Sequence, residues 1–331
     1  MPFRCSLVYT LALNAALLSA QSLPGPSPAF PAGRFYAPYI MPRPTPDLAN
    51  TYLSQISEAS GIRYFTLAFI IGGNAGSEAC QASWGARTPL SQENTLAPAI
   101  ETLRAHGGDV LISFGGEAGK ELALVCDTPA ALQAQYQAVI DKYKLSVLDL
   151  DIEGTAIKDT ASVDRRNTAL AAIQAANPNI QISYTLPVAT NGLTPSGIAL
   201  LNNAMEHGVK VALVNLMTMD YGAAADPLAM GSHAITAVNG TVAQMLDNGI
   251  RARIGICPMI GNNDVKPEVF TLADAKQVFD WAQANPIVTR LTMWSVSRDN
   301  PCAEGSTRTG SSCSGVAQQA YEFSKILNTF H

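Results

Sequence analysis

The sequence predicts an α/β fold built from eight strands that alternate with eight helices. The second predicted strand, residues 63–73, is an almost unbroken apolar run that ends in glycines, as in a strand covered on both faces. Each predicted strand is followed by a segment with helical periodicity. Regular alternation of this kind over about 300 residues is typical of a single (β/α)8 barrel. The alternative is a doubly wound open sheet, but no GxGxxG fingerprint follows a first strand.

The predicted strands have the apolar or alternating patterns of buried strands. They lie at residues 35–41, 63–73, 109–116, 146–154, 180–188, 210–222, 253–261 and 288–299. The predicted helices follow them at residues 47–60, 91–106, up to 144 with a break near 127–129, 163–176, 196–207, 233–248, 271–285 and 316–329. Thr271 begins its helix clearly, because Asp274 three residues later completes a capping box. A long loop with Cys80 and Trp84 is expected after the second strand.

The first 34 residues differ in composition from the rest. Arg4 precedes an apolar run at residues 7–18, and the small residues Ser19 and Ala20 follow it, which is the pattern of a secretory signal peptide. We expect residues 1–20 to be that signal peptide, residues 21–34 a Pro-rich leader, and residues 35–331 the barrel. Because the apolar run is too short to span a membrane, the chain is expected to be secreted and extracellular.

Cysteine usage agrees with export to an oxidising compartment. Removal of Cys5 with the signal peptide leaves five cysteines, an odd number that cannot all pair within the chain. We expect the disulfides Cys80–Cys126 and Cys302–Cys313, although sequence alone does not determine the connectivity. Cys257, in an apolar segment, is then expected to be a buried free thiol.

Composition narrows the class of partner. The chain has 331 residues, 47% hydrophobic and 14% charged, with a formal net charge of −5 and no cluster of Lys or Arg. Nucleic acids and anionic membranes require concentrated positive charge, so neither is an expected partner and a neutral substrate fits better. No histidines and cysteines have the spacing of zinc ligands, so we expect no metal and no cofactor. We also expect a monomer.

The fourth predicted strand, SVLDLDIEG at residues 146–154, carries an unusual row of acids. Asp149, Asp151 and Glu153 alternate with Leu and Ile, so they share one face of the strand within about 14 Å. Like charges this close, together with burial, raise the pKa of at least one acid, and Glu153 at the strand end is best placed to hold that proton. The alternatives are a solvated acidic face, which usually mixes acids with Thr, Lys and Ser, and a Ca²⁺ or Mg²⁺ cage, which normally uses loop oxygens.

Further polar and aromatic residues fall at the ends of later strands. Asp220 and Tyr221 end the sixth predicted strand, and Trp294 lies late in the eighth. Active sites of (β/α)8 barrels lie at the carboxyl ends of the strands, so these residues and Glu153 are expected to meet at one mouth. Glu117, after the third strand, is interpreted as a loop residue.

These motifs resemble glycoside hydrolase family 18, the chitinases, and most closely a bacterial and archaeal-type branch. The family patterns DGxDxDxE on strand four and MxYD on strand six are similar to this sequence at Ser146, Val147, Asp149, Asp151 and Glu153, and at Met217, Met219 and Asp220. SFGG at residues 113–116 and Trp294 also resemble family features.

Two positions depart from the family pattern. Ser146 replaces the first Asp, which is remote from the chemistry, so a small effect is expected. Met219 replaces the Tyr whose hydroxyl holds the substrate acetamido group. Tyr221, two residues on and on the same predicted strand face, is the candidate to supply that hydroxyl, and Tyr184 on the fifth strand is the second choice.

The resemblance implies a chitinase that cleaves β-1,4 bonds between N-acetylglucosamine units with retention, using the substrate acetamido oxygen as nucleophile. It implies that Glu153 is the acid and then the base, that Asp151 orients the acetamido group, and that Asp149 tunes Asp151 by sharing a proton. Trp294 is expected to form the floor beneath the reacting sugar. The other expected substrate contacts are Asp220, Tyr221, Met217, Tyr184, Tyr36 and Trp84.

Two other functions stay open on sequence alone. An endo-β-N-acetylglucosaminidase acting on N-glycans would share the chemistry. A non-catalytic chitin-binding lectin or inhibitor would share the barrel, but such proteins usually lose the acid, and Glu153 is present.

Overall fold

The computed structural model describes residues 30, 33–42, 51–73, 80–222, 225–303, 310 and 312–331. The predicted signal peptide, residues 1–20, and most of the predicted leader lie outside the described residues, so both boundaries stay predictions. Within the described part of the chain, no helix is both long and apolar enough to cross a membrane.

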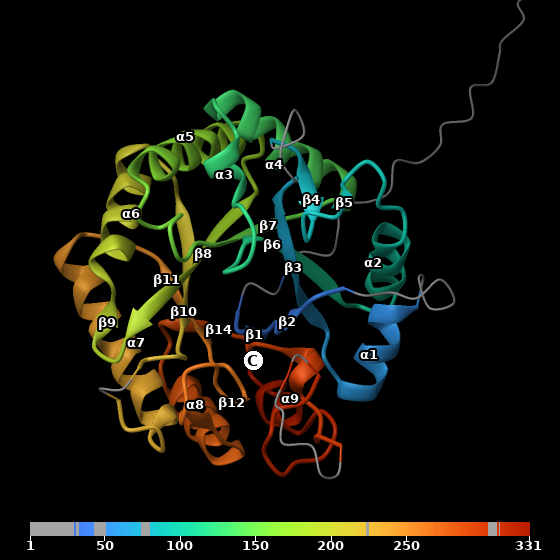
Figure 1. Cartoon of the computed structure of the whole chain (residues 1–331), viewed down its shortest axis with the longest axis vertical. Coiled ribbons are helices and arrows are strands. Elements are labelled where there is room, and N and C mark those ends of the chain that lie inside the picture. Colours follow the sequence, from blue (N-terminus) through green and yellow to red (C-terminus); the bar gives the residue numbers. More distant parts are fainter. Residues whose placement is uncertain are drawn as a thin grey trace, which may run out of the picture.

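Eight strand positions form a closed parallel barrel (Figure 1), which confirms the predicted fold. The first position is shared by β1 (Phe35–Tyr36) and β2 (Tyr39–Ile40). The ring closes through them, because β1 pairs with the last barrel strand and β2 with the second. The remaining barrel strands are β3 (Tyr64–Gly72), β6 (Asp109–Gly115), β7 (Val147–Asp151), β8 (Gln181–Ala189), β10 (Val211–Met217), β11 (Arg253–Cys257) and β14 (Val288–Leu291).

Helices surround the barrel (Figure 1). They are α1 (Tyr52–Ser60), α2 (Leu96–Ala105), α3 (Leu122–Val125), α4 (Pro129–Tyr143), α5 (Thr160–Ala176), α6 (Pro195–Glu206), α7 (Met230–Asp247), α8 (Leu272–Ala284) and α9 (Glu322–Leu327). The predicted capping box of α8 is present, with Thr271 and Asp274 each accepting from the other's backbone N–H. The last helix is shorter than predicted: Tyr321 has a left-handed backbone with φ of 58°, so α9 begins only at Glu322.

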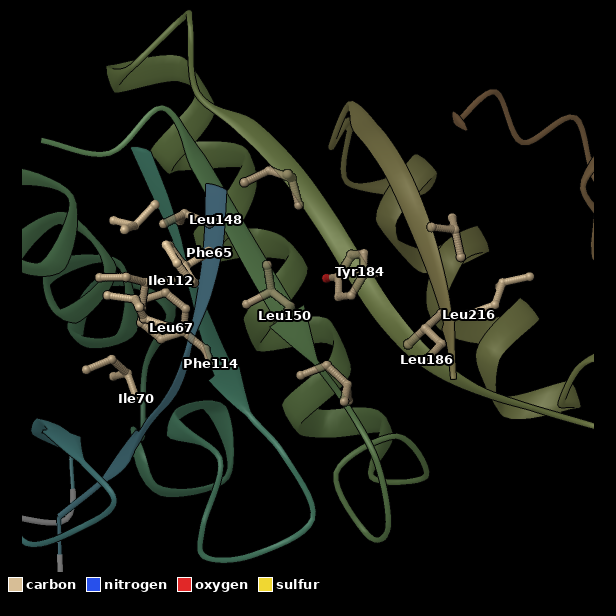
Figure 2. Packing of buried hydrophobic residues seen from close by; sticks show 14 of the residues in the cluster. Phe65, Leu67, Ile70, Ile112, Phe114, Leu148, Leu150, Tyr184, Leu186 and Leu216 are labelled. Atoms are coloured by element: carbon tan, nitrogen blue, oxygen red, sulfur yellow. The ribbon is translucent and has the colours of Figure 1, made fainter. Parts of the chain in front are cut away.

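Each barrel strand divides its side chains between two faces. Leu148 and Leu150 of β7 belong to the apolar cluster between strands and helices, together with Phe114 and Leu186 (Figure 2). The intervening Asp149 and the following Asp151 therefore point into the barrel, because strand side chains alternate. This is the division that the sequence pattern predicts.

Short antiparallel strands extend the structure beyond the barrel ring. They are β4 (Ala82–Trp84), β5 (Thr88–Pro89), β9 (Gly192–Leu193) and the pair β12 (Gly261–Asn262) and β13 (Val269–Phe270). The loop expected around Trp84 is thus partly strand, because residues 82–84 pair with the end of β3. Both predicted disulfides, Cys80–Cys126 and Cys302–Cys313, are present, and Cys257 is a buried free thiol.

Candidate active site

A cavity of about 220 Å³ lies at the carboxyl ends of the barrel strands. Its wall combines acids, aromatic rings and sulfur-containing side chains. The lining residues are Tyr39, Met41, Phe69, Glu117, Ala118, Asp151, Glu153, Thr185, Met217, Met219, Asp220, Cys257, Met259, Asp264 and Trp294. The cavity therefore brings together the ends of strands that are far apart in sequence. Within the described residues, no group of three or more His, Cys, Asp or Glu side chains has the geometry to hold a metal ion.

Asp149 lies below the cavity, fully buried in the barrel. Its carboxylate accepts hydrogen bonds from the Tyr39 hydroxyl at 2.7 Å and the Ser113 hydroxyl at 2.8 Å. It also accepts from the hydroxyls of Ser183, at 2.7 Å, and Thr185, at 3.0 Å. A carboxylate that receives this many donors is stabilised in its charged form.

An ion pair completes the surroundings of Asp149. Arg290 Nη2 lies 3.0 Å from Asp149 Oδ1, and both side chains are buried, with 2% and 0% of their surface exposed. The attraction between them offsets part of the cost of burying two charges. Asp149 is thus an ion-paired acceptor at the barrel floor and does not line the cavity.

Asp151 is the buried acid of the cavity itself. Its Oδ1 has no hydrogen-bond partner among the described residues. Burial raises its pKa well above the usual range, and the charges of Glu153 and Asp149 and a hydrogen bond to Glu153 raise it further. These causes all favour the protonated form of Asp151, whose hydrogen bond runs to Glu153.

Glu153 follows β7 and is half-buried in the cavity wall. Burial is the largest cause that raises its pKa, to about 7, and the negative charges of Glu117 and Asp220 add to it. The hydrogen bond from Asp151 acts in the opposite direction. A carboxylic acid that stays partly protonated at neutral pH can act as a proton donor there.

Asp220 stands on a turn that ends β10. Its backbone has a left-handed φ of 51°, and its Oδ1 accepts a hydrogen bond from the Val265 N–H at 2.7 Å. Glu268 holds the next residues by accepting from the N–H groups of Tyr221, at 3.1 Å, and Gly222, at 2.7 Å. Burial raises the pKa of Asp220. The turn thereby fixes Asp220 at the cavity wall.

Three aromatic rings form one wall. Phe69 and Trp294 are stacked, with centroids 5.7 Å apart and planes 17° apart. Tyr39 lies 6.0 Å from Trp294 and 5.9 Å from Phe69. Trp294 is half-buried, so part of its ring can contact a ligand in the cavity.

Four predicted contact residues lie away from the cavity. The Tyr221 ring packs against the His233 ring with their centroids 5.7 Å apart, and the Tyr221 hydroxyl is buried near Thr218. The expectation that it shares a strand face with Met219 is wrong, because β10 ends at Met217 and the left-handed turn at Asp220 breaks the alternation.

Tyr184 is buried on the helix side of β8 (Figure 2), where its hydroxyl donates to Asn167 Oδ1. Tyr36 is also on the helix side, with its hydroxyl 3.4 Å from Ser324 Oγ. Trp84 donates through Nε1 to the Tyr143 hydroxyl at 2.9 Å and lines a separate hollow with Pro42. These three residues therefore do not line the cavity, contrary to the expectation.

Several cavity residues are not evident from the sequence. Tyr39 is the cavity tyrosine, whereas the sequence analysis selected Tyr36 from the same segment. Phe69 and Met259 lie in apolar runs that give no sign of a cavity. Arg290, which does not line the cavity, has a signal in the sequence, since an Arg within the apolar start of the eighth predicted strand is unusual in a buried position.

A closed parallel barrel with a carboxylate-centred, aromatic-walled cavity at its carboxyl end defines the chain as a barrel of the glycoside hydrolase class. No protein-family model matches the sequence. The fold is similar to active domain 2 of a chitinase from Pyrococcus furiosus, with 31% identity and a TM-score of 0.79 over 92% of this chain and 96% of that one.

Two longer proteins are also similar in sequence. A probable bifunctional chitinase/lysozyme of Escherichia coli is 35% identical over 92% of this chain, and Endochitinase 11 of Metarhizium anisopliae is 36% identical over 84% of it. This chain spans 35% of the length of the first protein and 55% of the second. The chain belongs to glycoside hydrolase family 18, the family of the chitinases.

Proposed function

We propose that this chain hydrolyses β-1,4 bonds between N-acetylglucosamine units of chitin or its oligomers. The observation that carries the proposal is the pair of acids Asp151 and Glu153 in the cavity wall, hydrogen-bonded to each other, with the pKa of both raised and that of Glu153 raised to about 7. The relatives named as chitinases support the same reaction.

Glu153 has the position of the general acid. In the first step it gives its proton to the glycosidic oxygen, the bond from that oxygen to C1 breaks, and the acetamido oxygen of the same sugar bonds to C1. In the second step the Glu153 carboxylate takes a proton from water, whose oxygen attacks C1 and opens the oxazolinium ring. Two successive displacements at C1 retain its configuration.

Asp151 has the position to bind the acetamido group. Its unpartnered Oδ1 is an acceptor for the acetamido N–H. When the proton of Asp151 has passed through Glu153 to the leaving oxygen, the negative charge of Asp151 balances the positive oxazolinium and Glu153 is the carboxylate that the second step needs. Asp149 keeps its ion pair with Arg290 beneath it. Met217 and Met219 supply an apolar wall for the acetamido methyl group, and Trp294 an apolar face for the sugar ring.

We also propose that the chain is exported from the cell and that it is a monomer. Its two disulfides are typical of an oxidising compartment. N-terminal sequencing of the exported chain is expected to begin at Gln21.

Glu153→Gln tests the reaction directly. Because Gln cannot give a proton to the leaving oxygen, kcat on an N-acetylglucosamine hexamer should fall at least ~100-fold while binding persists. Glu101→Gln, an exposed acid on α2, is the matched control and should keep wild-type turnover. Turnover by Glu153→Gln at the wild-type rate would contradict the assignment of the acid. Binding without hydrolysis by the wild-type chain would favour a lectin instead.

A further inference from the structure

The barrel floor contains a buried cation, Arg290, that has no role in the proposed reaction steps. Arg290 on β14 donates through Nη2 to Asp149 at 3.0 Å and to Ser183 Oγ at 2.6 Å. In the described part of the chain, Arg290 is the only basic side chain that forms an ion pair with one of the three acids. Arg290 does not line the cavity but is connected to it through Asp149, which accepts hydrogen bonds from the lining residues Tyr39 and Thr185.

The hydrogen bonds around Asp149 favour a charged carboxylate, because Arg290 can only donate and four hydroxyl groups also surround Asp149. Ser183 accepts from Arg290, so the Ser183 hydrogen is directed to Asp149. Thr185 accepts from Asn215 Nδ2 at 3.1 Å, and its own hydrogen can go to Asp149 at 3.0 Å or to the Tyr39 hydroxyl at 2.8 Å, which itself donates to Asp149.

Asp151, only two residues later on the same strand, has the opposite surroundings. Its Oδ1 has no partner among the described residues, and its one side-chain hydrogen bond runs to Glu153. We propose that Arg290 is a positioning residue of the active site, which holds Asp149 as a carboxylate and thereby keeps the single proton of the two aspartic acids on Asp151, facing Glu153. The expected effect of Arg290 on the pH profile of kcat/KM rests on the proposed function. Its expected effect on the protonation of Asp149 and Asp151 does not.

The titratable groups that face the three acids come from several elements. Around Asp149 and Asp151 they are Tyr39 on β2, Cys257 on β11 and Arg290 on β14. Around Glu153 they are Glu117 after β6 and Asp220 after β10, with Asp264 also in the cavity wall. Arg290 is the positive charge in this set, so its removal makes the site more negative.

Arg290→Met tests the proposal. One proton then remains for two aspartic acids without a counter-cation, so Glu153 experiences one additional negative charge. Glu153 lies about 13 Å along the chain from the level of Asp149. At an effective dielectric constant of ~20, a unit charge at this distance shifts the alkaline limb of the pH profile of kcat/KM upward by about one pH unit.

Two variants separate charge from structure. Arg290→Lys keeps the positive charge and should leave the alkaline limb in place. Arg166→Met removes a different fully buried Arg, paired with Glu121 outside the barrel interior, and should destabilise the chain without moving the limb. A role of Arg290 in packing alone would lower kcat/KM in both Arg290 variants and shift the limb in neither.

A second measurement does not depend on activity. ¹³C NMR of labelled Asp and Glu carboxyl groups, recorded across the pH range of the assay, should show Asp149 as a carboxylate in the wild type and sharing a proton in Arg290→Met. If Arg290→Met does not fold, the double variant Asp149→Asn/Arg290→Met removes both buried charges, and its Glu153 midpoint should lie close to the wild-type value.

The outcomes are distinguishable. A wild-type chain that cleaves no chitin oligomer contradicts the proposed function, while the titration still decides the role of Arg290. An Asp149 that titrates near neutrality in the wild type, or an alkaline limb that does not move in an active Arg290→Met, overturns the role of Arg290.

Discussion

Glu117→Gln is expected to lower the pH at which activity falls on the alkaline side. Glu153 must be protonated to act as the acid, and its pKa of about 7 places the alkaline limb of kcat/KM near pH 7. Burial makes this possible, since a Glu with its ordinary pKa of 4.5 would be protonated in only about 1 in 300 molecules at pH 7. The negative charge of Glu117 contributes to the raised pKa, so removing that charge lowers it.

The magnitude follows from the size of the cavity. Both carboxylates line the same space of about 220 Å³, which is about 8 Å across if it is taken as a sphere. A charge at ~8 Å moves a titration by about 1.5 pH units at an effective dielectric constant of ~20 and by about 0.4 pH unit in bulk water. Because Glu117 is exposed, the effect lies near the lower value, and we expect a shift of about 0.5 pH unit.

The assay is kcat/KM on an N-acetylglucosamine oligomer from pH 5 to pH 9 at constant ionic strength. The shift should shrink at 1 M salt, because added ions screen exposed charges. Glu101→Gln provides the control for loss of an exposed acid elsewhere. An unchanged or upward limb in Glu117→Gln would refute the electrostatic account of Glu153.

Two more predictions concern the same cavity. The Glu153 pKa is raised from 4.5 to about 7, so the folded chain binds more protons than the unfolded chain in that range and loses up to about 3 kcal/mol of stability as the pH rises through it. Urea unfolding should therefore give Glu153→Gln a larger free energy of unfolding than the wild type at pH 8 and a smaller difference at pH 5. Equal free energies of unfolding for the two chains at both pH values would contradict this prediction. Trp294→Ala should lower kcat/KM on the oligomer ~10-fold or more, because it removes a cavity wall. Trp84→Ala should keep kcat/KM within about 2-fold of the wild type, because Trp84 does not line the cavity. Equal losses in the two variants would contradict the placement of the two rings.

The barrel could be predicted because its signals are local. Apolar strand segments, helical periodicity and the capping box at Thr271 each depend on a few neighbouring residues. The alternation in β7 is also local, and it places Asp149 and Asp151 on the interior face. The shortened α9 was not predictable in this way, because a left-handed residue at Tyr321 leaves no clear mark in the sequence.

The tyrosines show where local reasoning stops. Tyr36 and Tyr39 lie in one short segment, and Pro38 between them interrupts the strand, so alternation cannot decide which ring enters the barrel. Tyr221 was expected on the wrong face because the pattern of β10 was extended through the turn at Asp220. In both cases the deciding feature is a change of backbone direction, which residue spacing does not encode.

The different protonation of the two aspartic acids arises from strand register. Asp149 is level with Ser113 on β6 and Ser183 on β8, so each neighbouring strand supplies it with a hydroxyl donor. Asp151 is level with Gly115 on β6, which has no side chain to donate, and its other neighbour, Thr185, has its hydroxyl contacts with Asp149 and Tyr39. A Cβ at Gly115 would lie 2.1 Å from the Asp151 carbonyl oxygen, so a hydroxyl-bearing residue cannot replace it without moving β7. One strand therefore presents two different acids. Asp149 at the floor has hydrogen-bond donors on both carboxyl oxygens, whereas Asp151 at the mouth has an oxygen without a partner among the described residues and can hold a proton for Glu153.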